Sequence, residues 1–463
     1  MTLKVIIFVI MQSNKFNNIF YWSDYNGCAF FRGLMATETC WSFGPQTGVG
    51  NSVISKPVFD EKFYAGINML MVQRLVADET EQLFDNWFVP LSHKYRFWTV
   101  FNIDDLTDYR FIPMYNRGRR AFIGDKAQGN IKKMMNNSDF ILTTTGYLRQ
   151  KFHECYDIPL ENILCIPNLL PRWWIGSYFH PKECLENFRA FKKKPRVGIV
   201  SSLSHYNISG VKQDKNGLAA FEDKNPDGSV VWHNEKNEVV DEKELQDITD
   251  DFDTVIDVIR KTIDEVQWVV FGYSPPKLEK EIKAGKIEIH PAVPIMNYPA
   301  ALNALHLNAI VAPLVADSEF NKSKSNIKFL ESCAIGVPLY APDMITYSPY
   351  MPKAQLYSSS DELLEKVLKL KSMSSTVFED IIRRQYRFLN SPFQEVQCSL
   401  KNWWLEDNMD IWMKLFRLPY KSMLCSLDKF REVKEREEND KKEAEKTAEI
   451  LLQKPENGIE ILK

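Results

Sequence analysis

The chain has 463 residues, of which 44% are hydrophobic and 13% aromatic, and this length is too great for one ordinary hydrophobic core. The composition excludes a disordered or a fibrous protein, and a formal net charge of −3 gives the chain as a whole no preference for an anionic partner. The eight cysteines form no CxxC pair and no group with zinc-ligand spacing, which favours reduced thiols and a cytoplasmic protein.

The first half of the chain alternates between apolar runs and amphipathic runs. Residues 4–11 are apolar but too few to span a membrane, and the polar residues that follow favour a buried first strand over a signal peptide. Further strands are predicted at 18–23, 96–103, 139–144 and 162–167, and helices at 65–76 and 146–156. This alternation indicates an α/β domain with a largely parallel sheet.

A change of composition predicts a domain junction near 170–194. A segment rich in Pro and Trp follows Asn168, and a basic run at 192–194 precedes the next apolar strand. We therefore expect a first domain at 1–180 and a second at 181–395.

The second domain repeats the alternation of strands and helices. Its strands are predicted at 195–202, 266–272, 286–291, 307–314 and 337–342. The polar residues 208–250 predict an insertion with a small hairpin. Residues 396–463 predict C-terminal helices, and the first of these, at 402–416, should pack back on the first domain because its three tryptophans need burial. No further run is long enough to cross a membrane.

The densest motif is 313–338, where a polar loop leads from a strand into a helix that begins near Ser325. On a helical period, Lys324, Lys328 and Glu331 share one face. Two cations and a carboxylate at the start of a helix suit a nucleoside diphosphate, because cations and helix N-terminal amides bind phosphate oxygens and a carboxylate accepts hydrogen bonds from ribose hydroxyls. A solvated ion pair on an ordinary helix would give the same pattern, so both interpretations stay open at this point.

This motif resembles the donor site of retaining GT-B glycosyltransferases, especially the GT4-like group. Their nucleotide-contacting Glu precedes a run of small residues that ends in Gly-Val-Pro, and Glu331 with the following CAIGVP matches that position. Many members carry an earlier acidic residue where this chain has Ser323. The resemblance covers about 18–390 and implies an α/β fold of two Rossmann-like domains facing a central cleft, followed by the C-terminal helices.

The resemblance also implies a set of donor-side residues in the second domain. Lys324 and Lys328 are expected to act on the diphosphate during catalysis, His205 is expected to reach it from another loop, and Glu331 is expected on the ribose. Ordinary loop or core roles are the alternatives for the rest. The full set is Lys324, Ser325, Lys328, Glu331, Ser202, His205, Val293 and Tyr298.

The first domain is expected to face the acceptor. The segment 22–33 resembles the loop that lies opposite the donor, which implies a catalytic role for Asp24, close backbone approach at Gly27 and an acceptor contact for Arg32. Asp104 and Asp105 follow a strand and are expected to orient the acceptor hydroxyl, with helix capping as the alternative. A basic cluster at 110–133 is a further candidate for the acceptor, or else a solvated face; its central residues are Arg117, Arg119 and Arg120.

The implied reaction moves a sugar from a nucleotide sugar, expected to be a UDP-sugar, to an acceptor hydroxyl with retention of configuration. A donor phosphate oxygen helps to take the acceptor proton, so neither a permanent cofactor nor a metal ion is expected. The sequence also resembles bacteriophage glycosyltransferases, which suggests 5-hydroxymethylcytosine in phage DNA as acceptor, in the host cytoplasm and without membrane insertion. The alternatives are a surface-glycan, lipid-linked or small-molecule acceptor, or a non-catalytic protein that binds nucleotide sugars or nucleic acid.

Overall fold

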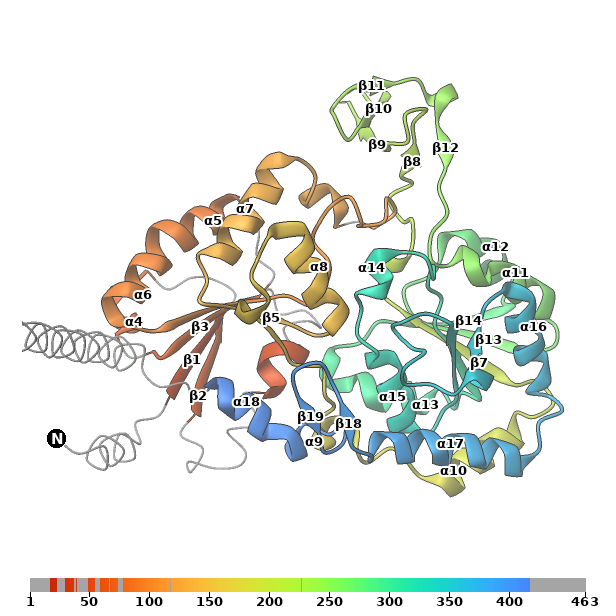
Figure 1. Cartoon of the computed structure of the whole chain (residues 1–463). Coiled ribbons are helices and arrows are strands. Elements are labelled where there is room, and N and C mark those ends of the chain that lie inside the picture. The colour runs from red at the N-terminus through yellow and green to blue at the C-terminus, as the bar shows by residue number, and fades with distance from the viewer. Residues whose placement is uncertain are drawn as a thin grey trace, which may run out of the picture.

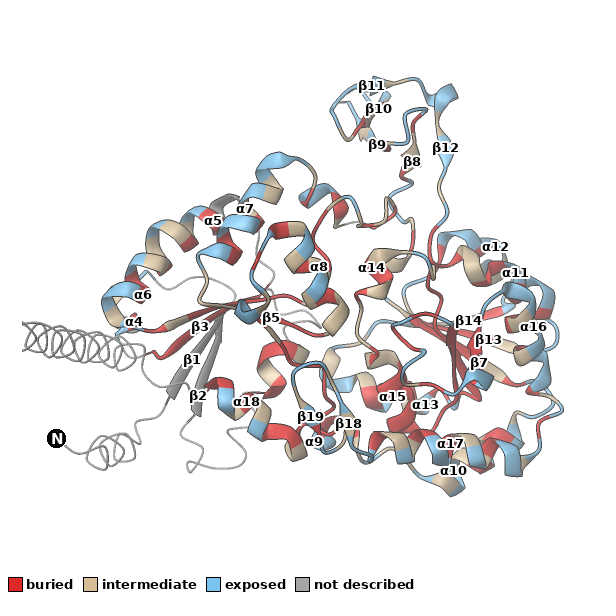
Figure 2. Cartoon of the chain, in the orientation of Figure 1, coloured by how far each residue is buried: buried red, intermediate tan, exposed pale blue. Residues whose placement is uncertain are grey.

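The computed structural model describes residues 17–22, 30–36, 39, 49–54, 59–65, 67–73, 78–116, 118–225 and 227–416. Two parallel sheets flanked by helices lie side by side, and a smaller antiparallel sheet projects from the second of them (Figure 1). Buried residues concentrate in the strands and on the helix faces turned toward them (Figure 2).

The first sheet has six parallel strands in the order β2-β1-β3-β4-β5-β6. The strands are β1 Asn17–Trp22, β2 Val49–Ile54, β3 Met69–Gln73, β4 Trp98–Asn102, β5 Phe140–Thr143 and β6 Ile163–Cys165. The helices are α4 Glu61–Tyr64, α5 Asp78–Leu83, α6 Val89–Tyr95, α7 Asp125–Asn136 and α8 Gly146–Tyr156, with π-helical turns η1 Phe30–Leu34 and η3 Phe84–Phe88. Thr145 caps α8 by accepting a hydrogen bond from the Leu148 amide.

Most elements of the first half were predicted correctly, but one was not. The strands predicted at 96–103, 139–144 and 162–167 contain β4, β5 and β6, the strand predicted at 18–23 covers all of β1 except its first residue, and the helix predicted at 146–156 is α8. The predicted helix at 65–76 is wrong, since this segment contains β3. All five residues of β3 are buried, as in a central parallel strand that is covered on both faces. In such a continuous apolar run, polar and apolar residues do not alternate with a period that would distinguish a strand from a helix. Residues 4–11 lie outside the described residues.

The second sheet also has six parallel strands, in the order β14-β13-β7-β15-β16-β17. The strands are β7 Arg196–Ser201, β13 Gln267–Gly272, β14 Ile287–Pro291, β15 Ala309–Val311, β16 Leu339–Pro342 and β17 Leu356–Tyr357. The helices are α10 Pro181–Ala190, α11 Asp253–Thr262, α12 Glu279–Lys283, α13 Tyr298–Ala304, α14 Glu319–Lys322, α15 Ile327–Ile335, α16 Ser360–Lys369 and α17 Ser375–Leu389. Five of these strands were predicted within one or two residues at most ends, because their apolar runs are bounded by polar turns.

The polar segment 208–250 folds into an antiparallel sheet of five strands in the order β11-β10-β9-β8-β12. The strands are β8 Lys212–Gln213, β9 Ala219–Lys224, β10 Val230–Asn234, β11 Val239–Val240 and β12 Gln246–Asp247, and the predicted hairpin is part of this sheet. The sheet contacts the first half of the chain, where Arg119 Nε lies 2.6 Å from Glu235 Oε1 and Arg120 lies 3.3 Å from Asp223.

The C-terminal described segment returns to the first half. It contains β18 Phe393–Gln394, β19 Ser399–Leu400 and α18 Met409–Phe416, and it lies beside the short helix α9 Arg172–Ile175 (Figure 1). Trp403, Trp404 and Trp412 are buried, and the Arg32 guanidinium lies 5.5 Å from the centre of the Trp412 ring. The helix predicted over 402–416 is shorter than expected, because Trp404 instead forms an extended bridge with Leu170. Among the described residues, no helix is long and apolar enough to cross a membrane.

Candidate active site

A cavity of about 810 Å³ is lined by residues from both halves of the chain. Most of them follow the carboxyl ends of β7, β13, β14 and β15, which is where α/β sheets bind their ligands. Gly272 at the end of β13 has φ +118°, and a Cβ there would lie 2.4 Å from the Ser201 carbonyl oxygen, so only glycine fits this close approach of two strand ends. The first half contributes Phe31, Asp104, Asp105 and Asn168.

Helix α15 brings the carboxylate of the sequence motif to the cavity wall. Glu331 is only 4% exposed, and its Oε2 lies 3.2 Å from Lys328 Nζ one turn earlier. The helix ends at Gly336, whose φ of 70° is left-handed and where a Cβ would lie 2.7 Å from the Cys184 sulfur. This end fixes the register of α15 and therefore the face on which Lys328 and Glu331 lie.

Tyr298 holds Glu331 in place. Its hydroxyl donates to Glu331 Oε2 at 2.9 Å, and burial, followed by the charge of Glu331, raises its pKa well above the ordinary value, so the hydroxyl keeps its proton. The ring is stacked between Phe271 and Trp174, with centroid distances of 5.7 and 5.9 Å. Tyr298 therefore contributes a ring to the cavity wall, while its hydroxyl is occupied by Glu331.

The polar contacts of Glu331 within the described residues all fall on one oxygen. Lys328 and Tyr298 both contact Oε2, so Oε1 is the oxygen that can accept hydrogen bonds from a ligand in the cavity. A carboxylate with one oxygen fixed by the protein and the other available suits a vicinal diol such as a ribose.

Contacts from the first half of the chain reach Lys324 and Ser325, the two cavity residues in the loop before α15. Lys324 Nζ lies 3.6 Å from Asp105 Oδ1, and Asn168 Nδ2 donates to Ser325 Oγ at 3.0 Å. Asp104 accepts from Gln73 Nε2 at 3.4 Å. Both aspartates lie in the loop after β4 and line the cavity, so they do not cap a helix, which was the alternative interpretation.

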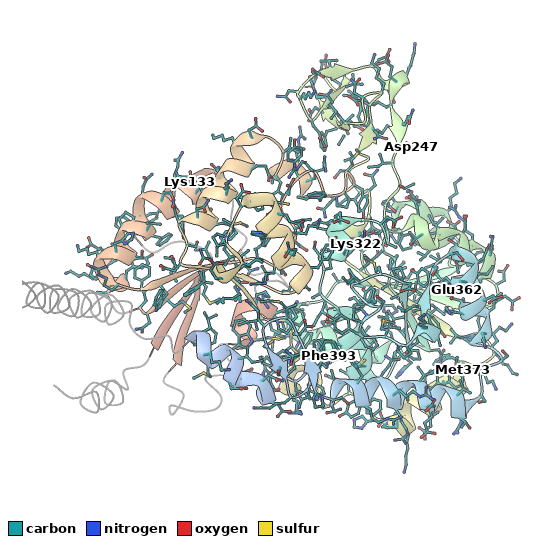
Figure 3. The ribbon with its side chains drawn as sticks, viewed as in Figure 1. Lys133, Asp247, Lys322, Glu362, Met373 and Phe393 are labelled. Atoms are coloured by element: carbon teal, nitrogen blue, oxygen red, sulfur yellow. The ribbon has the colours of Figure 1, made fainter. Side chains whose placement is uncertain are left out.

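A second interface between the halves lies beside these contacts, where α8 faces α14 (Figure 1). Lys151 Nζ lies 2.9 Å from Glu319 Oε2, and Lys322, labelled in Figure 3, lies 3.0 Å from Glu319 Oε1. The Tyr147 hydroxyl, followed by Lys151, holds the pKa of Glu319 at about 2. Glu319 therefore ties the two halves together and does not line the cavity.

The loop after β7 presents Ser202 and His205 to the cavity, as expected. Ser202 Oγ lies 2.6 Å from Ser204 Oγ, and His205 Nδ1 lies 2.8 Å from Asp251 Oδ2. Asp251 is buried and was not singled out from the sequence, because aspartates at 250–253 directly before a helix are typical of ordinary caps.

No protein-family model matches this sequence, and no curated protein matches it. Among solved structures, Anabaena Alr3699/HepE in complex with UDP and glucose aligns with a TM-score of 0.52 and 10% identity, over 87% of this chain and 100% of that one. A glycosyltransferase from Rickettsia africae ESF-5 aligns with a TM-score of 0.50 and 10% identity, over 87% of this chain and 98% of that one. This chain has the GT-B fold.

The GT-B fold confirms the predicted fold class and places the cavity in the cleft between its two Rossmann-like halves. The cavity brings together ten of the residues proposed from the sequence. They are Ser202, His205, Val293, Tyr298, Lys324, Ser325, Lys328, Glu331, Asp104 and Asp105. Asp24, Gly27 and Arg117 lie outside the described residues.

Arg32 does not reach this GT-B cleft, contrary to the sequence expectation. Its guanidinium is fully buried, and it donates to the carbonyl oxygens of Ile166 at 2.6 Å and Thr143 at 3.1 Å. These carbonyls lie at and after the ends of β5 and β6, so Arg32 ties the strand ends together and has no access to an acceptor from this position.

Arg119 and Arg120 do not line the cleft either. The side chains of Arg119 and Glu235 are 8% and 6% exposed, so this ion pair is buried, and the Arg120 guanidinium lies 5.0 Å from the centre of the Phe221 ring. The antiparallel insertion therefore pairs with two of the three arginines of this cluster that were expected to meet the acceptor.

Several cavity residues were missed or given a lesser role in the sequence analysis. Phe31, Asn168, Tyr273 and Tyr347 line the cavity, and Trp174 supports Tyr298 from outside it. Asn168 and Tyr273 each directly follow a predicted strand, and Phe31 lies in the segment 22–33, so these three carried a usable signal, whereas Tyr347 carried none. Within the described residues, no group of three His, Cys, Asp or Glu side chains is placed to hold a metal ion.

Proposed function

We propose that this chain is a glycosyltransferase that moves a sugar from a UDP-sugar to an acceptor hydroxyl. The observation that carries the proposal is the arrangement of Glu331, which lines the cavity and whose Oε2 is held by Tyr298 and Lys328, so that Oε1 is left for a ligand. The ribose of the donor would bind Oε1, and the base would lie against Val293 and Phe271. The neighbour from Anabaena with the same fold was solved with UDP and glucose, which supports uridine as the nucleoside.

The cavity wall that contains Glu331 also supplies the cations that sugar transfer requires. As the bond between the sugar C1 and the diphosphate oxygen breaks, negative charge grows on the diphosphate, and Lys324 and Lys328 stabilise it electrostatically. The acceptor hydroxyl attacks C1 from the same face, and its proton passes to the departing phosphate oxygen. The sugar therefore keeps its configuration and no protein base is needed.

For the acceptor, the contacts favour a carbohydrate, lipid-linked or small-molecule hydroxyl over DNA. A DNA acceptor would need several cations free to meet phosphates. In the basic cluster, Arg119 and Arg120 are paired with the insertion, and three further cations are paired within the first half. Those pairs are Arg110 with Asp108, Lys132 with Asp157, and Lys133 with Glu81 and Asp85.

The 5-hydroxymethylcytosine of DNA remains the alternative acceptor that the bacteriophage resemblance suggests. It would need the base turned out of the duplex into the cleft. We propose the cytoplasm as the site of the reaction, because the charged nucleotide sugar then meets the enzyme without crossing a membrane.

A mass-spectrometric screen tests the proposal. Purified protein is incubated with a panel of nucleotide sugars, with and without oligosaccharides, lipid-linked sugars and DNA that carries 5-hydroxymethylcytosine. We expect UDP release from at least one UDP-sugar and its loss in Lys324→Ala. NMR of the anomeric signal of the product tests retention. Absence of hydrolysis and transfer with every donor, despite tight UDP binding, would favour the non-catalytic alternative, and transfer to DNA would overturn the acceptor choice.

A further inference from the structure

The carboxylate of Asp251 contacts two hydrogen-bond donors and the ring of His205. Its Oδ1 accepts from the Val315 backbone amide at 2.8 Å and from Asn321 Nδ2 at 2.7 Å. Its Oδ2 lies 2.8 Å from His205 Nδ1. The side chain of Asp251 is 1% exposed and that of His205 is 18% exposed, so the aspartate lies behind the histidine, which lines the cavity.

These contacts decide where the proton of His205 lies. An ionised carboxylate only accepts hydrogen bonds, so the ring nitrogen that faces it is a donor, and the proton lies on Nδ1. In the neutral ring, Nε2 then carries a lone pair. Because Nδ1 is bound to Asp251, Nε2 is the ring nitrogen left for the ligand.

We propose that Asp251 is a positioning residue for His205, and that the pair takes up one proton from solvent when the diphosphate of the donor binds. This inference rests on the proposed function, because it needs UDP in the cavity. Phosphate oxygens also accept only, so a lone pair on Nε2 would face them unfavourably. Addition of a proton to Nε2 turns His205 into a charged donor toward the diphosphate.

Asp251 stabilises that doubly protonated ring because its carboxylate balances the new charge, as a buried aspartate does behind a catalytic histidine. In this binding step, neutral His205 takes one proton from the buffer as UDP binds, and the resulting imidazolium donates Nε2–H to a phosphate oxygen. During transfer this hydrogen bond strengthens as charge grows on the departing diphosphate, and no bond to His205 forms.

Other charged groups near this pair do not offer the same proton. The charged side chains that line the cavity beside the pair are those of Lys324, Lys328, Glu331, Asp104 and Asp105, and none of them contacts the His205 ring in the described residues. Asp250, the neighbouring aspartate, is held by the Asn207 amide and lies 3.7 Å from Lys277.

Tyr115 approaches the pair from the first half of the chain. Burial, followed by the charge of Asp251, raises its pKa far above the ordinary value, so it keeps its proton. Tyr347, which lines the cavity, also has a raised pKa because of burial and then the charge of Asp251.

Calorimetry of UDP binding tests the proposal. Titrations at pH 8 in three buffers with different ionisation enthalpies measure the number of protons taken up. At this pH, ordinary histidine side chains are neutral and a terminal phosphate, with a second pKa of about 6, is ionised. We expect the wild-type chain to take up close to one proton per UDP, and His205→Gln to take up none.

Asp251→Asn gives a sharper test. Val315 and Asn321 both donate toward Oδ1, so the amide oxygen stays there and the amide NH2 turns to His205 Nδ1, which must then accept. The ring carries its proton on Nε2 before UDP binds. We expect proton uptake to vanish and UDP affinity to fall by about tenfold, because the neutral ring still donates Nε2–H to a phosphate oxygen but no longer places a positive charge beside the diphosphate.

Asp250→Asn is the matched control, because it removes a neighbouring buried carboxylate that does not contact His205. It should keep the full proton uptake even if it lowers the melting temperature. Wild-type binding of UDP with no proton uptake, or full uptake in a folded Asp251→Asn variant, would overturn the inference while leaving the UDP site in place. Failure of the wild-type chain to bind UDP would instead overturn the proposed function.

Discussion

Tyr298→Phe removes a single hydroxyl from the wall of the cavity. The ring keeps its place, because Phe has the same shape and the stack between Phe271 and Trp174 depends only on the ring. What is lost is the 2.9 Å hydrogen bond to Glu331 Oε2 and the 3.4 Å hydrogen bond that the hydroxyl accepts from Lys328 Nζ. Glu331 is then held by Lys328 alone, at 3.2 Å.

The size of the effect follows from the charge of the acceptor. A hydrogen bond to a charged group contributes about 1.5–3 kcal/mol. We take the lower end, about 1.5 kcal/mol, because Lys328 still contacts the same oxygen. Without the hydrogen bond, the Glu331 carboxylate must be fixed in place when the ribose binds. A free-energy loss of about 1.5 kcal/mol then raises the Kd for UDP by about tenfold.

Isothermal titration with UDP measures this change, and thermal unfolding measures the accompanying loss of stability. Tyr156→Phe is the matched control, because the Tyr156 hydroxyl also donates a buried hydrogen bond, to Gln128 Oε1 at 3.0 Å, but in the first half and away from the cavity. It should lower stability and leave UDP affinity unchanged. A Kd in Tyr298→Phe within twofold of the wild-type value would refute the reasoning about Glu331.

Three further perturbations address other parts of the molecule. Lys328→Ala should lower kcat by more than it raises the Kd for UDP, because the cation acts on charge that grows during transfer; steady-state kinetics and calorimetry compare the two. Arg119→Ala leaves the buried Glu235 carboxylate without its partner and should lower the free energy of unfolding by about 3–5 kcal/mol. Denaturant unfolding measures this change. A change below about 1 kcal/mol would mean that the insertion does not pack against the first half in solution. Arg119→Ala with Arg120→Ala should leave the affinity for duplex DNA low and its dependence on salt unchanged in fluorescence anisotropy; a steep wild-type salt dependence that flattens in this variant would instead support the DNA acceptor.

The strands at the centre of each half were the most predictable part of the fold. Their apolar runs end at polar turns, and this contrast gives the element ends in the second half within a few residues. The exception, β3, shows the limit of the method. Its residues Met69–Gln73 are buried on both faces, and a segment with no exposed side has no period to measure.

The part of the cavity wall formed by the loop before α15 and by α15 could be predicted because its residues lie close together in the sequence. Lys324, Lys328 and Glu331 share one loop and helix, so helical spacing alone places them together. Arg32 could not be interpreted in the same way. Its partners at Thr143 and Ile166 lie 111 and 134 positions away, and only the packing of the sheet decides whether such an arginine faces a ligand or the strand ends.

The same argument explains why Asp251 was missed. It lies 46 positions from His205, after the antiparallel insertion, and its local sequence indicates a cap at the start of α11. The sequence suggested Tyr298 as a donor contact but did not reveal its hydrogen bond to Glu331. The two residues lie 33 positions apart, and the sequence does not show which residue of α13 faces α15.

The cavity wall is divided unequally between the two halves, and this division has a consequence for specificity. The second half supplies most of the lining, including the residues proposed to bind the nucleotide, whereas the first half supplies Phe31, Asp104, Asp105 and Asn168. Two of these four contact the loop that carries Lys324 and Ser325. If Lys324 moves to a donor phosphate, its 3.6 Å pairing with Asp105 weakens, and the carboxylate becomes a stronger acceptor for an incoming hydroxyl. Under the proposed function, donor binding in the second half would thereby prepare the acceptor side in the first, and we expect the nucleotide sugar to bind before the acceptor.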